Sequence, residues 1–301
     1  ILDTSIAMKY EKTHPWINFN VDSRQASLYT WLLLGEAQSK CKHIAGALLD
    51  PETAKELHRM YLAKGVLATT AIEGNTLTEE QVLNHLEGKL ELPGSKENLR
   101  QEIENIIKAC NDIADSHFYG SGVDLCVDEI RQYNKLVLDE LPLQDDVVPG
   151  RFRDFSAIVG HYRGAPAEDL EYLMEKMCDM LEGGTFSTLG ERWHIASGIL
   201  KAIIAHLYIA WIHPFGDGNG RTARLVEFKI CISAGIPAPA AHLLSNHYNE
   251  TRNAYYLALD KKNKTQNPFP FIQYALEGYG DQLEEKIAKI RQTQNKTFWT
   301  N

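Results

Sequence analysis

One stretch around residue 213 constrains the fold more than any other part of the chain. Residues 196–210 are apolar nearly all round, which is typical of a helix buried at the centre of a domain. Residues 222–234 are again mostly apolar and predict a second helix. The loop between them is rich in glycine, so its backbone can turn sharply and approach a ligand closely. The pair predicts a helical core with a binding site at the bend.

The backbone of this loop suits a phosphate group. Gly216, Gly218 and Gly220 alternate with Asp217 and Asn219. A glycine-rich turn that opens into a helix offers unpaired N–H groups and the positive end of a helix dipole, and both attract phosphate. We therefore expect these five residues to surround the phosphates of a nucleotide.

Three kinds of side chain in the stretch add chemistry to this cradle. Arg221 and Arg224 are three residues apart, so one helical face carries two guanidinium groups for phosphate oxygens. Asp217 supplies the hard oxygen ligand that Mg²⁺ on a polyphosphate needs. His213 is a base that works near neutral pH and lies at the rim of the same loop. Together they predict a site that handles nucleotides.

Other phosphate and metal motifs do not match this stretch. A Walker loop requires a lysine that the segment from Gly216 to Arg221 lacks, and the dinucleotide fingerprint would need a third glycine where Arg221 stands. An EF-hand beginning at Asp217 would place Phe228 at its last ligand position. A plain glycine turn beside a core histidine would not explain two spaced arginines next to these residues.

The segment from His213 to Arg224 resembles the signature of the Fic family, His-Pro-Phe-x-x-Gly-Asn-Gly-Arg-x-x-Arg. The resemblance implies an all-α, mainly helical Fic fold with one short β-hairpin flap and an N-terminal helical region packed on the Fic core. It also implies a protein adenylyltransferase that moves AMP from ATP, with Mg²⁺, to a Ser, Thr or Tyr hydroxyl of a target protein or of itself. His213 would be the catalytic base.

A second motif lies well before the loop. Thr69-x-x-x-Glu73-Gly74-Asn75 resembles the inhibitory motif of many Fic proteins, and its position resembles the class whose inhibitory helix is N-terminal. Thr69 and Glu73 share one face of the expected helix, which should end at Gly74. In the resemblance Glu73 pairs with Arg224 and blocks the γ-phosphate. The alternative is a glutamate that only solvates a helix end, where the dipole disfavours it.

Residues 150–166 alternate in character, include Gly160 and Gly164, and predict a short hairpin. By resemblance this is the flap that aligns the target segment through backbone pairing, with Ile158, Val159 and Gly160 as its working part. A purely structural hairpin would give the same pattern, so the target-aligning role stays one of two interpretations.

A tyrosine pair followed by an asparagine resembles the part of the Fic fold that packs on adenine. Tyr255 and Tyr256 precede Asn263, so a ring could stack on the base while an amide reads it. We expect Tyr256 and Asn263 to take these roles. A pair of interior tyrosines and a loop asparagine remain the alternative.

Helical patterns cover most of the remaining chain. We expect an N-terminal helical region over 1–117, a Fic core over 118–275 and a C-terminal helical tail over 276–301. Within them, a capping box at Thr78–Gln81 should open one helix. Further helices are expected over residues 127–138, 168–182, 249–259, 269–279 and 281–294.

Composition limits the partners. The net charge of −9 argues against broad nucleic-acid binding, and no run of 18 apolar residues predicts a membrane span. Five scattered cysteines without a C-x-x-C pair favour reduced thiols, so we expect a cytoplasmic protein. The chain begins Ile-Leu-Asp-Thr without methionine, so we expect an upstream piece to be missing.

Two other functions stay open. A Fic-type transferase could use another donor and attach UMP, phosphocholine or phosphate, and an idle Fic module could merely recruit a partner. Removal of AMP, self-modification and a homo-oligomer are also open. The target protein is not named by any residue pattern.

Overall fold

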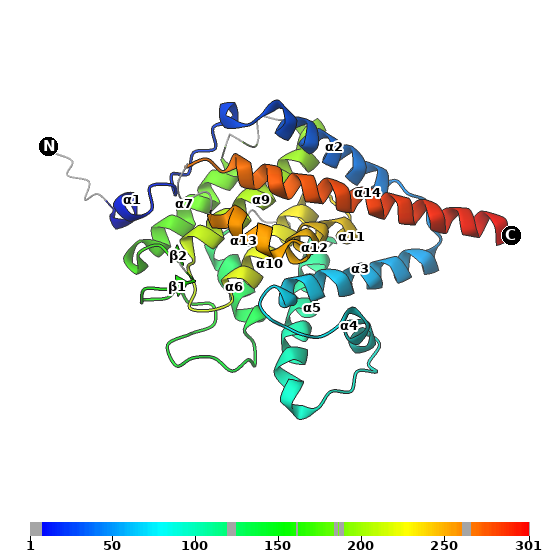
Figure 1. The fold of residues 1–301 in the computed structure, drawn as a ribbon, viewed down its shortest axis with the longest axis horizontal. Coiled ribbons are helices and arrows are strands. Elements are labelled where there is room, and N and C mark those ends of the chain that lie inside the picture. Colours follow the sequence, from blue (N-terminus) through cyan, green and yellow to red (C-terminus); the bar gives the residue numbers. More distant parts are fainter. Residues whose placement is uncertain are drawn as a thin grey trace.

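The computed structural model describes residues 8–118, 125–160, 162–183, 186, 190–260 and 266–300. It is a helical molecule with one small hairpin, as the sequence predicted, and it is built around two helices at its centre (Figure 1). These are α9 (His194–Ile212) and α10 (Asn219–Ser233). They pack against each other, and helices from the N-terminal, middle and C-terminal parts of the chain pack on them.

The bend between α9 and α10 is tighter than predicted. α9 ends where His213 takes the left-handed conformation, with φ of 51°. α10 begins at Asn219 because Gly218 caps it with φ of 74°, a conformation that costs glycine little. The prediction that the helix starts at Thr222 was therefore three residues late. Gly220 and Arg221 belong to the first helical turn instead of the loop.

The N-terminal region is helical, and its helix starts are capped as their sequences indicate. The Asp50 side chain accepts a hydrogen bond from the Thr53 N–H at the start of α3, and Thr78 and Gln81 form the predicted capping box of α4. The helices are α1 (Lys9–Thr13), α2 (Leu28–Ala45), α3 (Pro51–Ala71), α4 (Glu79–Leu86) and α5 (Glu97–Phe118), with 3₁₀ turns η1 (Ser23–Gln25) and η2 (Gly94–Lys96).

The remaining elements surround the central pair. β1 (Ile158–Val159) and β2 (Tyr162–Arg163) form the predicted antiparallel hairpin, with Val159 opposite Tyr162. The helix expected over 249–259 is broken at Thr251 between α12 and α13. The other elements are α6 (Val127–Val137), η3 (Ala167–Asp169), α7 (Leu170–Glu182), η4 (Glu191–Trp193), α11 (Ala238–Ala241), α12 (Leu243–Glu250) and α13 (Arg252–Asp260).

A single long helix, α14 (Phe269–Thr300), replaces the two terminal helices predicted over 269–279 and 281–294. The helix continues through Gly278. Glycine is required at this position because the His247 imidazole packs against it, and a Cβ there would lie 2.0 Å from His247 Nδ1. Buried Leu276, Tyr279 and Leu283 carry the apolar face across the glycines. α14 runs beside α2 and extends to the C-terminus at the edge of the molecule (Figure 1).

One hydrophobic core includes residues from all three predicted ranges, for example Val66, Ile203 and Leu283. The boundaries at 117/118 and 275/276 stay predictions. The segment Glu191–Ile212 is long and apolar enough to cross a membrane, with a mean hydropathy of 1.7. However, 89% of its apolar window is buried inside the fold, so here it serves as the central helix.

Candidate functional site

A cavity of about 500 Å³ opens at the bend between α9 and α10. It lies among the end of α3, the hairpin, α13 and the start of α10. Its walls include Glu73, Gly160, Tyr162, His213, Gly220 and Tyr256. Residues predicted from four separate motifs therefore meet around one space.

His213 is held at the mouth of this cavity by its backbone. Its N–H donates to the Ile209 carbonyl at 2.8 Å, and its own carbonyl accepts from Arg153 Nε at 2.8 Å. Burial, together with the Arg153 charge, lowers the pKa of His213 to about 4. The imidazole is therefore neutral at physiological pH and can accept a proton.

Arg153 is a site residue that the motifs did not reveal. It is buried, and its guanidinium donates to carbonyls of His213, Phe155 and Ala165. The Arg153 N–H also donates to the Pro214 carbonyl at 3.0 Å. One cation thus ties the base to the segments that flank the hairpin. In the sequence, the only sign of its role was that an arginine stands within an otherwise alternating, half-apolar stretch.

The loop after His213 is fixed by two asparagines. Asn134 of α6 donates to the Asp217 carbonyl at 2.9 Å. Asn219 accepts from the Phe215 N–H at 2.9 Å and donates to the Phe215 carbonyl at 2.8 Å. Both ends of the Asn219 amide thus serve the loop, and the predicted role of Asn219 in phosphate binding stays a prediction. The first-turn N–H groups of α10 are available as donors to a phosphate.

Arg224 is buried and paired with the N-terminal region. Its Nη2 donates to Glu73 Oε1 at 2.5 Å and to the Thr69 carbonyl at 2.9 Å. Thr69 contributes to this contact through its backbone. Burial opposes ionisation of Glu73, but the charge and hydrogen bond of Arg224, together with the charges of Arg221 and Arg252, outweigh it and hold the pKa of Glu73 below its usual value. Glu73 is therefore a carboxylate that occupies the guanidinium.

Glu73 reaches Arg224 from a turn rather than from a helix. α3 ends at Ala71, and the chain turns through Gly74, whose φ of 104° is a conformation that glycine tolerates. Gly220 makes the approach possible, because a Cβ at that position would lie 2.2 Å from Glu73 Oε1. The predicted helix end is thus two residues too long, although its glycine terminator is in place.

Arg221 is paired with a carboxylate that sequence reasoning missed. Its Nη1 donates to Glu102 Oε1 at 2.7 Å, and its Nη2 donates to Asp217 Oδ1 at 3.2 Å. The other oxygen of Glu102 accepts from Asn75 Nδ2 at 2.9 Å, in the turn that follows Glu73. Glu102 lies on the polar face of α5, and no local spacing distinguishes it from its neighbours.

The Fic/DOC family model matches residues 124–231, which include the loop and His213. The chain contains a Fic domain. It is 30% identical over 227 residues to protein adenylyltransferase fic-1 of Caenorhabditis elegans, covering 75% of this chain and 41% of that protein. It is 29% identical over 231 residues to protein adenylyltransferase Fic of Nematostella vectensis, covering 76% and 49% respectively. The chain thus spans less than half the length of these relatives.

Solved structures show the same fold. A Fic family protein from Desulfovibrio desulfuricans G20 matches with a TM-score of 0.71 and 23% identity, covering 88% of this chain and 76% of that one. Fic-1 of C. elegans matches with a TM-score of 0.70 and 24% identity, covering 88% and 73%. The all-α Fic fold expected from the motif is therefore confirmed.

The two tyrosines of the predicted adenine site have different surroundings in the Fic cavity. Tyr255 is buried, and its hydroxyl is 2.9 Å from His206 Nε2. Both tyrosines line the cavity, but Tyr256 is 44% exposed, so its ring is the more accessible of the two to a base. Asn263 lies outside the described residues.

The hairpin overhangs the Fic cavity, with Gly160 and Tyr162 in its wall. The Tyr162 hydroxyl donates to the Trp211 carbonyl and anchors the hairpin to α9. The Ile158 side chain is 62% exposed, and Gly160 forms the turn after Val159 with φ of 57°. The hairpin itself is confirmed, while its pairing with a target segment stays a prediction.

Asp217 offers an exposed carboxylate beside the phosphate cradle. Its Oδ1 accepts from the Gly218 N–H at 2.5 Å as well as from Arg221. Within the described part of the chain, no group of three or more His, Cys, Asp or Glu is placed to hold a metal ion. A Mg²⁺ at Asp217 would therefore need phosphate oxygens and water for its other ligands, which is how Mg²⁺ commonly binds nucleotides.

Proposed function

We propose that this chain is a protein adenylyltransferase that transfers AMP from ATP to a hydroxyl of a target protein and to itself. The observation that carries the proposal is that a neutral His213, the glycine-rich start of α10 and Glu73 line one cavity, with Arg224 buried directly behind Glu73. The names of the similar proteins from C. elegans and N. vectensis support the same activity.

The residues suggest how the transfer proceeds. His213 takes the proton from a Ser, Thr or Tyr hydroxyl as that oxygen bonds to the α-phosphorus, and the bond to pyrophosphate breaks. First-turn N–H groups of α10 stabilise the phosphate charge. Arg221 and Arg224 clamp the β- and γ-phosphates. Asp217 would hold Mg²⁺, which offsets charge on the departing pyrophosphate.

Autoinhibition follows from competition for Arg224. Glu73 occupies the guanidinium that a γ-phosphate would need, and the close approach at Gly220 places its carboxylate beside the first turn of α10. ATP that binds with Glu73 in place is held away from its productive pose. Removing the carboxylate would free the guanidinium. Competition for this one group therefore explains the inhibition without a second binding site.

Labelling with α-³²P-ATP tests the function. We expect Glu73→Gly to label itself about 5- to 150-fold faster than the wild type, the range of a typical coupling between sites. Adding His213→Ala should abolish that labelling while ATP binding, measured by calorimetry, persists. Full labelling by the double variant would refute the assignment of His213 as the base. A self-labelling rate in Glu73→Gly no higher than that of the wild type would contradict the inhibitory role of Glu73. Repeating the assay with UTP or CDP-choline in place of ATP shows which donor the protein uses.

A further inference from the structure

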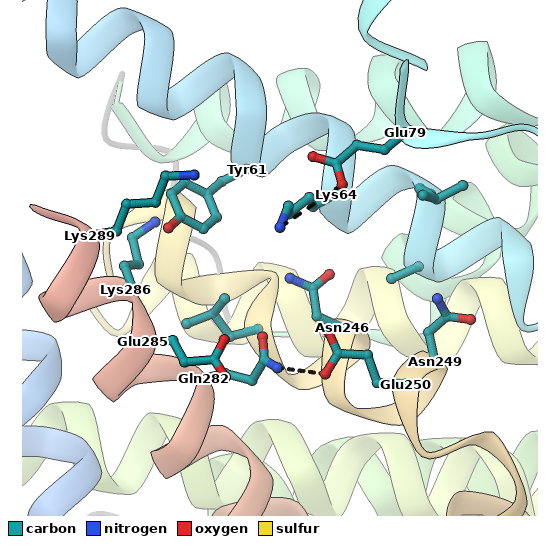
Figure 2. Close-up of a pocket in the computed structure, with 13 residues that line it drawn as sticks. Tyr61, Lys64, Glu79, Asn246, Asn249, Glu250, Gln282, Glu285, Lys286 and Lys289 are labelled. Carbon is teal, nitrogen blue, oxygen red and sulfur yellow. Dashed lines mark hydrogen bonds and ion pairs between the residues drawn. The ribbon is translucent and has the colours of Figure 1, made fainter. Parts of the chain in front are cut away.

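A second cavity lies away from the Fic loop, between α3, α12 and α14 (Figure 2). Its volume is about 230 Å³, enough for a small molecule rather than a nucleotide. Polar side chains from all three helices line it, among them Tyr61, Lys64, Asn246, Gln282, Lys286 and Lys289. Nothing in the proposed transfer reaction uses these residues.

Lys286 is the unusual member of this lining. Its side chain is 2% exposed, and its Nζ has no hydrogen-bond partner among the described residues. The Nζ lies 2.8 Å from the centroid of the Tyr61 ring. Burial, with Lys289 and Lys64 nearby, lowers the pKa of Lys286 to about 6. A buried amine without an acceptor is costly, so its position requires an explanation.

Two of the other charged residues around the cavity have polar partners. Lys64 lies 3.9 Å from Glu79, and Glu250 accepts from Gln282 Nε2 at 2.7 Å. Figure 2 shows the amines of Lys286 and Lys289 near Tyr61, with the Gln282–Glu250 pair toward the other end. The lysine end therefore brings together two amines, Lys286 and Lys289, for which no ion pair with a carboxylate is found among the described residues, although Glu285 also lines the cavity.

A second polar atom in the cavity is also unsatisfied. Asn246 is buried, and its Oδ1 has no hydrogen-bond partner in the described part of the chain. The cavity thus presents an amine that needs an acceptor and an amide oxygen that needs a donor. A small molecule with an oxyanion and a hydroxyl or N–H group would satisfy both.

We propose that this cavity binds a small molecule through its phosphate or carboxylate group, with Lys286 as the principal ligand. The oxyanion accepts hydrogen bonds from the Lys286 ammonium, and Lys289 adds charge at the entrance. A donor on the same molecule bonds to Asn246 Oδ1.

The position of the cavity gives the ligand a regulatory effect, which rests on the proposed function. α3 forms one wall, and Ala68 of that wall precedes Thr69, whose carbonyl accepts from Arg224. A ligand that bridges α3 to α12 and α14 binds best when α3 is docked. It therefore favours the state in which Glu73 holds Arg224, and it strengthens the inhibition.

Thermal unfolding of the whole chain in rising inorganic phosphate, at constant ionic strength, tests the binding. Lys286→Met keeps the length of the side chain without its amine, and Lys55→Met on the exposed surface of α3 is the matched control. At ten times the Kd we expect a rise of about 2–4 °C in the wild type and the control, and none in Lys286→Met.

Two results would overturn the binding site. An equal rise in Lys286→Met would place the phosphate elsewhere, such as at the glycine-rich loop. The absence of any saturable rise in the wild type, with phosphate and with acetate as the carboxylate probe, would show that the cavity does not take an oxyanion.

Self-labelling at fixed ATP tests the regulation. Phosphate should slow the wild type and Lys55→Met severalfold, and it should have less effect on Lys286→Met and on Glu73→Gly. An equal decline in Lys286→Met would refute the regulatory step. If no variant transfers AMP, the proposed function fails, whereas the unfolding experiment still decides the anion site.

Discussion

The two arginines of the glycine-rich loop have partners of different origin. Arg224 holds Glu73 of the turn after α3, and Arg221 holds Glu102 of α5 together with Asp217. Both guanidinium groups are buried, so each would be costly to leave without a negative partner. Asn75 joins the two contacts, because its amide donates to Glu102 from the turn that carries Glu73.

The Arg221 contact predicts the behaviour of Glu102→Gln. Removing this charge leaves a buried guanidinium with one exposed partner, so the free energy of unfolding should fall by about 2 kcal/mol. ATP should restore most of that loss, because its phosphates replace the carboxylate. Urea unfolding in the Glu73→Gly background, with and without ATP, measures both effects.

Asp112→Asn, on the exposed face of the same helix, is the control and should change neither quantity. A loss in Glu102→Gln that ATP does not offset would show that Arg221 is not a phosphate ligand.

The sequence anticipated residues whose roles depend on near neighbours. His213, Gly218 and Gly220 were recognisable because the loop concentrates them within a few positions. Glu102 was not, because its partner is 119 residues away and a helix face of ordinary charges hides it. The hydrogen bonds between the Asn219 amide and the backbone of Phe215 were not anticipated, because spacing alone does not show them.

At the scale of elements, α3 is positioned by a close approach to the Fic core. The His242 imidazole stacks on Phe228 of α10, with ring centroids 4.3 Å apart. On its other side it meets Gly65 of α3, where a Cβ would lie 2.3 Å from the ring. The helix that leads to Glu73 thus packs on α10 through one histidine and one glycine.

This packing predicts that Gly65→Ala raises self-labelling while leaving every site residue intact. The added methyl group forces α3 away from His242 and weakens the Glu73–Arg224 contact. Stability should fall by about 1–3 kcal/mol, the usual cost of overpacking. Labelling with α-³²P-ATP and urea unfolding give the two readouts, and the increase should vanish in the Glu73→Gly background.

Gly35→Ala in α2 is the matched control, because no atom lies within 4 Å of the added Cβ. It should stabilise the helix by about 0.5–1 kcal/mol and leave labelling unchanged. An unaltered self-labelling rate in Gly65→Ala would show that the position of α3 does not control the inhibition.

Element types were more predictable than element ends. The capping box at Thr78 and the apolar stripe of α9 identified their helices, since both signals are local. The two glycines in α14 indicated a break that burial of its apolar face overrides. The start of α10 was missed because a left-handed Gly218 can cap a helix as readily as extend a loop.

Across the whole molecule, buried neutral histidines make stability depend on pH. Burial lowers the pKa of His213 to about 4 and that of His242 to about 3. In the unfolded chain both groups titrate near 6.5, so the unfolded state binds more protons between that pH and the folded values. Their contribution is complete above pH 6.5 and is lost as the pH falls toward 4.

We expect the free energy of unfolding to decrease by about 2 kcal/mol per histidine between pH 6.5 and pH 5. Urea unfolding at several pH values measures the slope. His242→Phe keeps a ring against Phe228 but cannot take up a proton, so its slope should be shallower. A stability that stays constant over this interval would contradict the burial of neutral imidazoles.

The carboxylate partners of Arg221 and Arg224 affect how strongly nucleotide binding should depend on ionic strength. Glu73 and Glu102 act as internal counter-ions, so under the proposed function ATP would bind by exchanging one set of anions for another. Such an exchange alters the local charge less than filling a bare cationic pocket would. We therefore expect a shallow dependence of ATP affinity on ionic strength in the resting protein, and a steeper one once either carboxylate has been removed.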